Sequence, residues 1–307
     1  MSVSRQTPDP TLPEGANSVE KWSYDEAFCR NDGLISAAEQ QRLRKSRVAI
    51  AGMGGVGGVH LVTLARLGVG AFHIADFDKF GVANFNRQYG ADVATIGKGK
   101  AAVMADKART INPDVDLRVF DEAITADNVD EFLDGVDLVI DGIDFFSIEA
   151  RRNLFAAARQ RNIWAITAGP IGFSTAWLTF DPKGMPFDTY FDVNDSMDRI
   201  EQLVAFSVGL SPRATQLSYF DLSRVDLQSG AAPSVSLACQ LASGVAATEA
   251  IKILLDRSPI RAAPCYTQFD AYRQIIRKGR LLWGNRGPLQ RLKRKLLARQ
   301  VRRMCGP

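Results

Sequence analysis

The sequence is poor in the side chains that bind transition metals. It has four cysteines, which are Cys29, Cys239, Cys265 and Cys305. They are widely spaced and form no CxxC pair, so the sequence predicts no zinc site. Of the two histidines, His60 and His73, each adjoins an apolar run, where a histidine more often fills a structural position than a catalytic one. A structural zinc site is therefore not expected, and neither histidine is assigned a role.

Long apolar runs are also lacking. No run approaches the roughly 20 residues that a membrane-crossing helix needs, and residues 1–21 have no apolar core of the kind found in a signal peptide. We therefore expect a cytoplasmic protein. Residues 1–23 are rich in proline, serine and glycine and contain little that could form a core, so they are predicted to be a mobile leader.

Acidic residues are absent from the C-terminal end. Residues 273–307 contain 12 Lys and Arg and no Asp or Glu, so the chain's net charge of +4 leaves −8 for the rest. Within the predicted tail, residues 278–307, apolar side chains recur at helical spacing; they are Leu289, Leu292, Leu296, Leu297, Val301 and Met304. Such a basic amphipathic helix can bind an anionic membrane, RNA or an acidic partner, or dock on its own acidic domain.

Strand-like and helical patterns alternate through the first half of the chain. Short β-branched runs at residues 48–51, 72–76, 117–120 and 137–144 are separated by helical patterns at 59–67, 99–111, 126–133 and 148–161. This order predicts an α/β fold, a Rossmann-like mostly parallel sheet with helices on both faces. Residues 163–169 and 175–180 predict antiparallel strands that extend it, residues 182–233 a long loop, and residues 234–255 a buried helix. The folded domain is placed at residues 24–277.

A glycine-rich segment, AGMGGVGG at residues 51–58, follows the first strand and opens a helix. Glycines at this position let the backbone turn tightly and approach phosphates, which meet the free N–H groups of the helix. The candidate glycines are Gly52, Gly54, Gly55 and Gly57. Asp76 ends the next strand, where a carboxylate can accept hydrogen bonds from a ribose. These features alone fit an NAD enzyme as well as an ATP enzyme.

Three further segments separate these possibilities. They are DFDKFGVANFNRQYG at residues 76–90, IGKGK ending at Lys100, and DGID ending at Asp144. In order and spacing they resemble the D-x-D…N-x-x-R-Q stretch, downstream lysine and D-x-x-D aspartate of the ThiF/MoeB/HesA superfamily of ubiquitin-activating-enzyme-like adenylyltransferases. The resemblance covers about residues 24–270.

The resemblance implies that the protein uses ATP and Mg²⁺ to activate a carboxylate as an acyl-adenylate. The implied substrate is the C-terminus of a small ubiquitin-like or sulfur-carrier-type protein, a peptide, or a carboxylate on a larger carrier. Asp76 would hold the ribose, Asn84, Arg87 and Lys100 the phosphates, and Asp144 the Mg²⁺. The implied nucleotide-binding set is Gly52, Gly54, Gly55, Gly57, Asp76, Asp78, Asn84, Arg87, Gln88 and Lys100. Arg and Lys would offset the crowded negative charge of the transition state.

A segment near the N-terminus, residues 27–46, resembles the family's first helix, from which an arginine reaches the nucleotide of the partner subunit. Arg30 is the matching residue. The resemblance therefore implies a homodimer in which Arg30 joins Arg87, Lys100 and Asp144 as a catalytic residue.

The sequence also departs from the family pattern. Residues 182–233 contain no cysteine, and the two CxxC pairs of many members are absent, so a self-thioester step is not expected. Cys239 falls in an apolar helical pattern, where an inert thiol is expected. Two alternatives stay open: an NAD- or FAD-dependent oxidoreductase, in which Arg87, Lys100 and Asp144 would have no task, and a non-catalytic nucleotide-binding scaffold.

Overall fold

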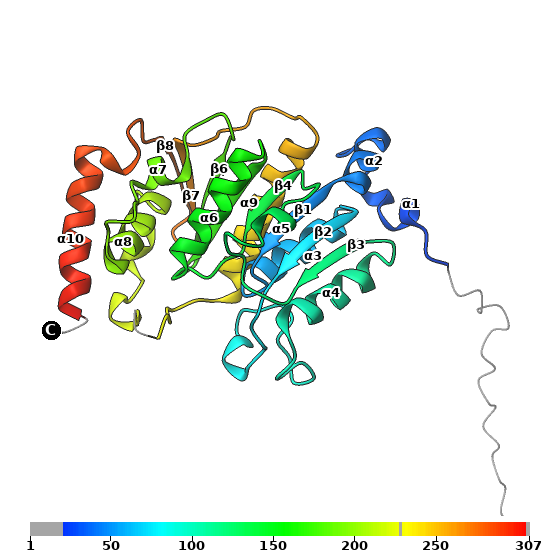
Figure 1. Cartoon of the computed structure of the whole chain (residues 1–307), viewed down its shortest axis with the longest axis horizontal. Helices are drawn as coiled ribbons and strands as arrows, with labels where there is room; N and C mark the ends of the chain where they lie inside the picture. Colours follow the sequence, from blue (N-terminus) through cyan, green and yellow to red (C-terminus); the bar gives the residue numbers. More distant parts are fainter. Residues whose placement is uncertain (1–20, 227–228, 305–307) are drawn as a thin grey trace, which may run out of the picture.

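An eight-stranded mixed β-sheet organises the protein (Figure 1). The computed structural model describes residues 21–226 and 229–304, and the strand order is β3-β2-β1-β4-β5-β6-β7-β8. The strands are β1 (Arg47–Ala51), β2 (Ala71–Ala75), β3 (Asp116–Phe120), β4 (Leu138–Asp141), β5 (Trp164–Ile171), β6 (Ser174–Phe180), β7 (Cys265–Asp270) and β8 (Ile275–Arg280). Strands β1 to β5 pair in parallel, and β6, β7 and β8 add antiparallel. The predicted fold class is confirmed.

Helices cover both faces of this sheet. The α-helices are α1 (Tyr24–Ala27), α2 (Ala37–Lys45), α3 (Gly57–Arg66), α4 (Lys100–Ile111), α5 (Val129–Phe132), α6 (Ile148–Gln160), α7 (Phe187–Phe191), α8 (Arg199–Leu210), α9 (Ser236–Leu254) and α10 (Pro288–Met304). Helices α3, α4 and α9 share one hydrophobic cluster with the sheet, whereas α5, α6, α7 and α8 share the other. The arrangement is a three-layer α/β/α sandwich.

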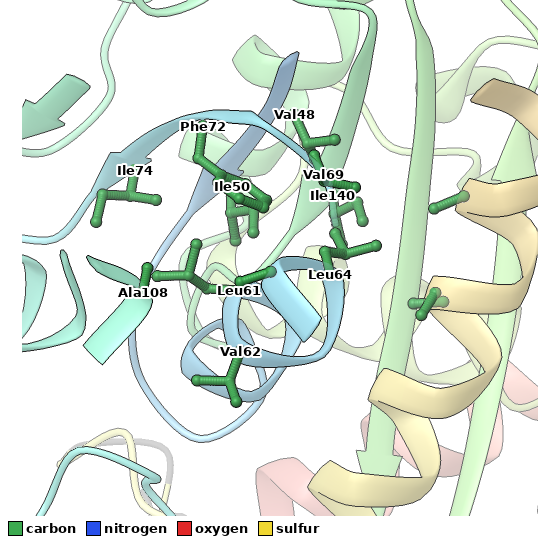
Figure 2. Packing of buried hydrophobic residues seen from close by; sticks show 14 of the residues in the cluster. Val48, Ile50, Leu61, Val62, Leu64, Val69, Phe72, Ile74, Ala108 and Ile140 are labelled. Carbon is green, nitrogen blue, oxygen red and sulfur yellow. The ribbon is translucent and has the colours of Figure 1, made fainter. Parts of the chain in front are cut away.

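Strand β1 shows how the sequence builds two cores at once. Val48 and Ile50 point into the cluster beneath α3, where Figure 2 shows them beside Leu61 and Leu64. The alternate residues, including Ala49, belong to the cluster on the opposite face. All of these side chains are fully buried. Side chains of a strand alternate between faces, so a strand covered on both sides reads as one continuous apolar run. Burying each large aliphatic side chain contributes roughly 1.5–3 kcal/mol.

The predicted loop at residues 182–233 was wrong in its centre, where α7 and α8 form. Asp198 caps α8, because its side chain accepts from the Glu201 N–H while the Glu201 side chain accepts from the Asp198 N–H. This capping box is a sequence signal for a helix start. The helix is buried on most sides, so it lacks the apolar and polar alternation that indicates a surface helix.

Helix α9 is the described helix that is long and apolar enough to span a membrane by length and composition. The expectation that no run comes near this length was therefore wrong. In the structure α9 packs on α3 and on strands β5 and β6, and half of the apolar window is buried. Its position between a helix and the sheet is that of a core helix, which agrees with the buried helix predicted at residues 234–255.

The two predicted terminal segments differ in how much of them is described. Of the leader, residues 1–20 lie outside the described residues, whereas Ser23 caps α1. The predicted boundary at residue 277 falls inside β8, which pairs with β7. The rest of the predicted tail forms α10, which packs along α8, and residues 305–307 lie outside the described part. The tail helix therefore docks on its own domain.

Candidate nucleotide-binding site

The loop between β1 and α3 packs against the turn after β4 through three glycines, Gly52, Gly57 and Gly142, whose backbones are in close contact. Gly52 has φ +92°, a conformation that side chains disfavour, and a Cβ there would overlap the Gly142 carbonyl. A Cβ at Gly57 would overlap the Gly52 carbonyl, and one at Gly142 would in turn crowd Gly52. Helix α3 begins at Gly57 and no described side chain caps it, so its first N–H groups can face an anion.

Asp76 fastens this loop to the end of β2. Its Oδ2 accepts from the Met53 N–H at 2.7 Å and its Oδ1 from the Asp78 N–H at 2.8 Å. Burial raises the pKa of this carboxyl, while the two backbone N–H donors and nearby Lys100 act in the opposite direction. Each oxygen has a second lone pair, so the carboxylate can accept a ribose hydroxyl while it holds the loop.

Asn84, Arg87 and Gln88 lie on the turn that follows β2. The Asn84 Oδ1 accepts from the Gly81 N–H, and the Arg87 guanidinium donates only to neutral oxygens, the Ala83 carbonyl and the Asn86 side chain. Arg87 makes no ion pair within the described residues, so its charge is available to a ligand. Gln88 is buried against the glycine loop, and its Oε1 has no hydrogen-bond partner among the described groups.

Lys100, the first residue of α4, pairs with Asp78 at 3.0 Å. Its side chain is 8% exposed, whereas that of Asp78 is 54% exposed. The Lys100 N–H also donates to the Asp78 carbonyl, which fixes the start of α4 against the turn after β2. A phosphate that reached Lys100 would therefore share the ammonium group with Asp78 or displace Asp78 from it.

Asp144 follows β4, the strand beside β1. Its Oδ1 accepts from the Phe146 N–H at 2.9 Å, and the residue is exposed. The preceding residues, Gly142 and Ile143, contact Gly52. The structure thus places Asp144 at the carboxyl edge of the sheet, next to the glycine loop, where open α/β sheets bind their ligands.

A buried ion pair, which sequence reasoning missed, supports this turn. The Arg151 Nε donates to the Asp141 Oδ2 at 2.6 Å, and both side chains are almost fully buried. Thr167 donates to the same carboxylate, and Arg151 also donates to the Ile143 carbonyl. The Arg151 guanidinium lies over the Phe206 ring. Arg151 is ten residues from Asp141 on a separate helix, a spacing that carries no sequence signal.

Arg30 does not join the other site residues within one chain. It lies in a short 3₁₀ helix, Cys29–Asn31, whose Asn31 donates to the Leu67 carbonyl just after α3. The glycine loop is at the other end of α3, and a helix of 10 residues spans about 15 Å. The remaining predicted residues converge on the carboxyl edge of the sheet.

We expect Gly57→Ala to disrupt this site, because the added Cβ overlaps the Gly52 carbonyl and forces the loop to move. The backbone N–H groups that would face the phosphates would then be displaced, so ATP affinity measured by calorimetry should fall. The matched control is Gly244→Ala, on the exposed side of α9, where a Cβ meets nothing within 4 Å. Equal ATP affinity in both variants would contradict the steric argument.

Cys239 lies in the first turns of α9 with its Sγ against Gly55. It is 1% exposed, and burial raises the pKa of its thiol to about 11 although Arg87 opposes the shift. At pH 8 about one molecule in a thousand then carries the thiolate. We expect iodoacetamide to label exposed Cys29 quickly and Cys239 only as the pH nears that pKa, as followed by mass spectrometry. Rapid labelling of Cys239 at pH 8 would show a reactive thiol.

Comparisons with known proteins agree with these features. The model of the ThiF family matches residues 28–285. The tRNA threonylcarbamoyladenosine dehydratase of Haemophilus influenzae is 34% identical over 154 residues, which are 50% of this chain and 58% of that protein. Ubiquitin-like modifier-activating enzyme 5 of Drosophila erecta is 37% identical over 137 residues, 41% of this chain and 33% of that one. The chain thus spans a third to about three fifths of the length of these relatives.

Solved structures share the fold. PaaA superposes with a TM-score of 0.64 at 18% identity and covers 89% of this chain and 77% of its own. The Escherichia coli dehydratase TcdA, in complex with ATP, gives 0.56 at 24% identity over 76% of this chain and 95% of its own. Escherichia coli MccB with ATP superposes with a TM-score of 0.57 at 18% identity and covers 80% of this chain and 66% of its own. At these identities the likeness establishes the fold.

Proposed function

Because the chain belongs to the ThiF family, we propose that it is an ATP- and Mg²⁺-dependent adenylyltransferase that activates a carboxylate as an acyl-adenylate. The observation that carries the proposal is the edge at which the glycine loop, Asp76, Arg87 and Asp144 meet. An NAD enzyme would use the glycine loop and Asp76, but Arg87 and Asp144 would then have no function. We place the enzyme in the cytoplasm.

The residues at this edge fit a nucleotide. Gly52 and Gly57 leave no room for side chains, so a phosphate can approach the backbone of the loop and the start of α3. Asp76 is placed to accept ribose hydroxyls, and the amide of Gln88 lies beside Gly54 through its Nε2. Arg87 brings a positive charge that no described carboxylate neutralises.

The same edge fits a Mg²⁺ ion bound together with a nucleotide. The described residues contain no group of three or more His, Cys, Asp or Glu that could hold a metal alone. Mg²⁺ commonly binds through one or two carboxylates plus phosphates and water, so the exposed Asp144 carboxylate suffices. When bound, the ion would neutralise charge on the phosphates. Zinc is not expected.

In the proposed reaction a substrate carboxylate oxygen attacks the α-phosphorus of ATP, and the bond to pyrophosphate breaks. Negative charge builds on the phosphate oxygens at that moment. Arg87 would stabilise this charge. Lys100 would contribute as well, with its ammonium group shared between Asp78 and the phosphate. The buried thiol of Cys239 has no part in the step, so we propose that the acyl group passes directly to another nucleophile.

Two kinds of carboxylate substrate are compatible with the relatives. We propose the C-terminus of a small protein or peptide, in agreement with the name of ubiquitin-like modifier-activating enzyme 5 and with MccB, which was solved in complex with N-formylated MccA. The other kind is a carboxylate on a larger carrier, because the dehydratase of Haemophilus influenzae is named for a modified tRNA nucleoside. Pyrophosphate exchange with either class would decide between them.

We also propose a homodimer in which Arg30 completes the partner's site. Arg30 is exposed and lies at the end of α3 opposite the glycine loop, so it can serve a nucleotide only in another copy. A symmetric pair would place two such residues in two sites. Sedimentation should show a dimer at micromolar concentration. A monomer with unimpaired ATP binding would remove the proposed role of Arg30.

We expect ATP with Mg²⁺ to bind and NAD not to bind in equilibrium titrations. Exchange of labelled pyrophosphate into ATP, with small proteins that end in Gly-Gly as the carboxylate, should fall on the order of 100-fold in Arg87→Gln, because a charge partner of the transition state is lost. Arg109→Gln removes an exposed arginine of α4 that pairs only with Asp106, and should keep full activity. Tight NAD binding without ATP binding would instead identify an oxidoreductase, and ATP binding without any turnover a scaffold.

A further inference from the structure

Three leucines of helix α10 face outward, while Gln290 and Arg294 face the domain. Leu289, Leu292 and Leu296 are 59%, 53% and 55% exposed. On the docked side, Gln290 is buried and donates to the Val208 carbonyl, and Arg294 pairs with Asp192 of the loop before α8. A helix held to its domain only by hydrophobic burial would face the other way. The outward leucines therefore need another explanation than docking.

The same outer face is basic. From Leu292 and Leu296, steps of three or four residues lead to Arg299 and Arg303, so these four side chains lie along one side of the helix. Arg291 and Lys295 flank the leucines and are exposed, as are Arg299 and Arg303. Within the described residues none of these four basic side chains forms an ion pair, whereas Arg294 and Arg302 do. Helix α10 contains seven Lys and Arg and no Asp or Glu.

Trp283 is a further exposed apolar side chain near the start of the helix. It is 68% exposed and stands just ahead of α10, next to Leu282, which is 58% exposed. Tryptophan combines a large apolar ring with a polar N–H and is enriched where a hydrocarbon layer meets water. Figure 1 shows α10 along the outer edge of the molecule, where it packs along α8. A broad surface can approach this edge freely.

We propose that the outer face of α10, together with Trp283, binds the surface of a bilayer that contains anionic phospholipids. The leucines would enter the boundary between headgroups and acyl chains, and the flanking arginines and lysine would meet the phosphates, as in interfacial amphipathic helices. The charge of the face matches an anionic bilayer. This surface is separate from the nucleotide site.

Other occupants fit the face less well. RNA would match the arginines but would leave Leu289, Leu292 and Leu296 without apolar partners. A second copy docked symmetrically through the same helix would set basic side chains against each other with no acid to offset them. A bilayer provides both an apolar and an anionic component.

The test is flotation of the full-length protein with vesicles of phosphatidylcholine, alone or with phosphatidylglycerol. We expect binding only to the second kind, weakening as salt rises. The emission of Trp283 should shift to the blue on binding, a signal that Trp283→Phe loses. The double variant Leu292→Ser/Leu296→Ser should bind roughly 10-fold or more weakly, because two apolar side chains no longer enter the bilayer.

Two control variants make the test specific. Arg299→Gln/Arg303→Gln should weaken binding, whereas Arg277→Gln/Lys278→Gln, which removes the same charge from exposed positions of β8, should leave it near the original level. ATP binding, measured in parallel, should be unchanged in all four, so that loss of fold is separated from loss of the surface. No binding of the original protein to anionic vesicles would overturn the proposal. It would also be overturned if the leucine variant bound vesicles fully, or if that variant only turned a dimer into a monomer.

Discussion

Replacing Asp144 with asparagine is expected to reduce pyrophosphate exchange by roughly 100- to 1000-fold, the scale seen when one charge partner of a transition state is removed. The amide keeps the acceptor oxygen for the Phe146 N–H, so the turn after β4 should hold its shape. What is lost is the negative charge that a hard divalent cation requires. Calorimetry offers a check that needs no acyl substrate: ATP should bind the original protein more tightly with Mg²⁺ than with chelator present, and Asp144→Asn should lose that difference.

Asp134→Asn provides the matched control. Asp134 is also exposed, in the turn between α5 and β4, and lies before the strand that leads to the site. Its replacement should change neither exchange nor the Mg²⁺ dependence of ATP binding. Full exchange activity in Asp144→Asn would be the more serious outcome, because it would remove the basis for placing the nucleotide at this edge.

The largest loss of stability is expected from Arg151→Met. This change leaves the buried Asp141 carboxylate with Thr167 and the Ile143 N–H but without its cation. Breaking a buried ion pair from one side costs about 3–5 kcal/mol, which would lower the midpoint of thermal unfolding by roughly 10 °C. The turn that carries Asp144 should loosen as well, since Arg151 donates to the Ile143 and Asp144 carbonyls.

Two comparisons isolate the buried charge as the cause. Arg161→Met breaks an exposed pair with Asp130 just after α6 and should cost less than about 1 kcal/mol. The double variant Asp141→Leu/Arg151→Met removes both charges and should be more stable than Arg151→Met alone. Denaturant unfolding measures all three. A double variant less stable than the single one would show that packing, rather than an uncompensated charge, dominates.

The first half of the fold could be predicted because its signals are local. Strands β1, β2 and β4 are short apolar runs, and the glycines that follow β1 predict a tight turn into a helix. A parallel sheet covered on both faces produces such runs wherever it occurs. The antiparallel half was harder. Strand β8 is exposed and rich in basic residues, so the predicted boundary at residue 277 divides it, although it pairs with β7 along six residues.

The candidate site could be predicted in outline but not in its contacts. The motif positions lie at the carboxyl edge because of the order of strands, and Arg30 lies at the other end of α3. Spacing could not show that Lys100 is already paired with Asp78, or that Asp76 uses both oxygens to hold backbone N–H groups. Nor could it show Arg151 beneath the turn, because that contact depends on how α6 packs. The roles of these residues remain predictions.

The contact among Gly52, Gly57 and Gly142 has a consequence for how such a protein can diversify. The loop that would receive the nucleotide and the turn that carries Asp144 press directly on each other, with no side chain between them to absorb a change. A mutation that changes the shape of either segment should disturb the other, so selection should remove mutations in both. New substrate preferences should then arise in parts of the chain that do not touch these three glycines.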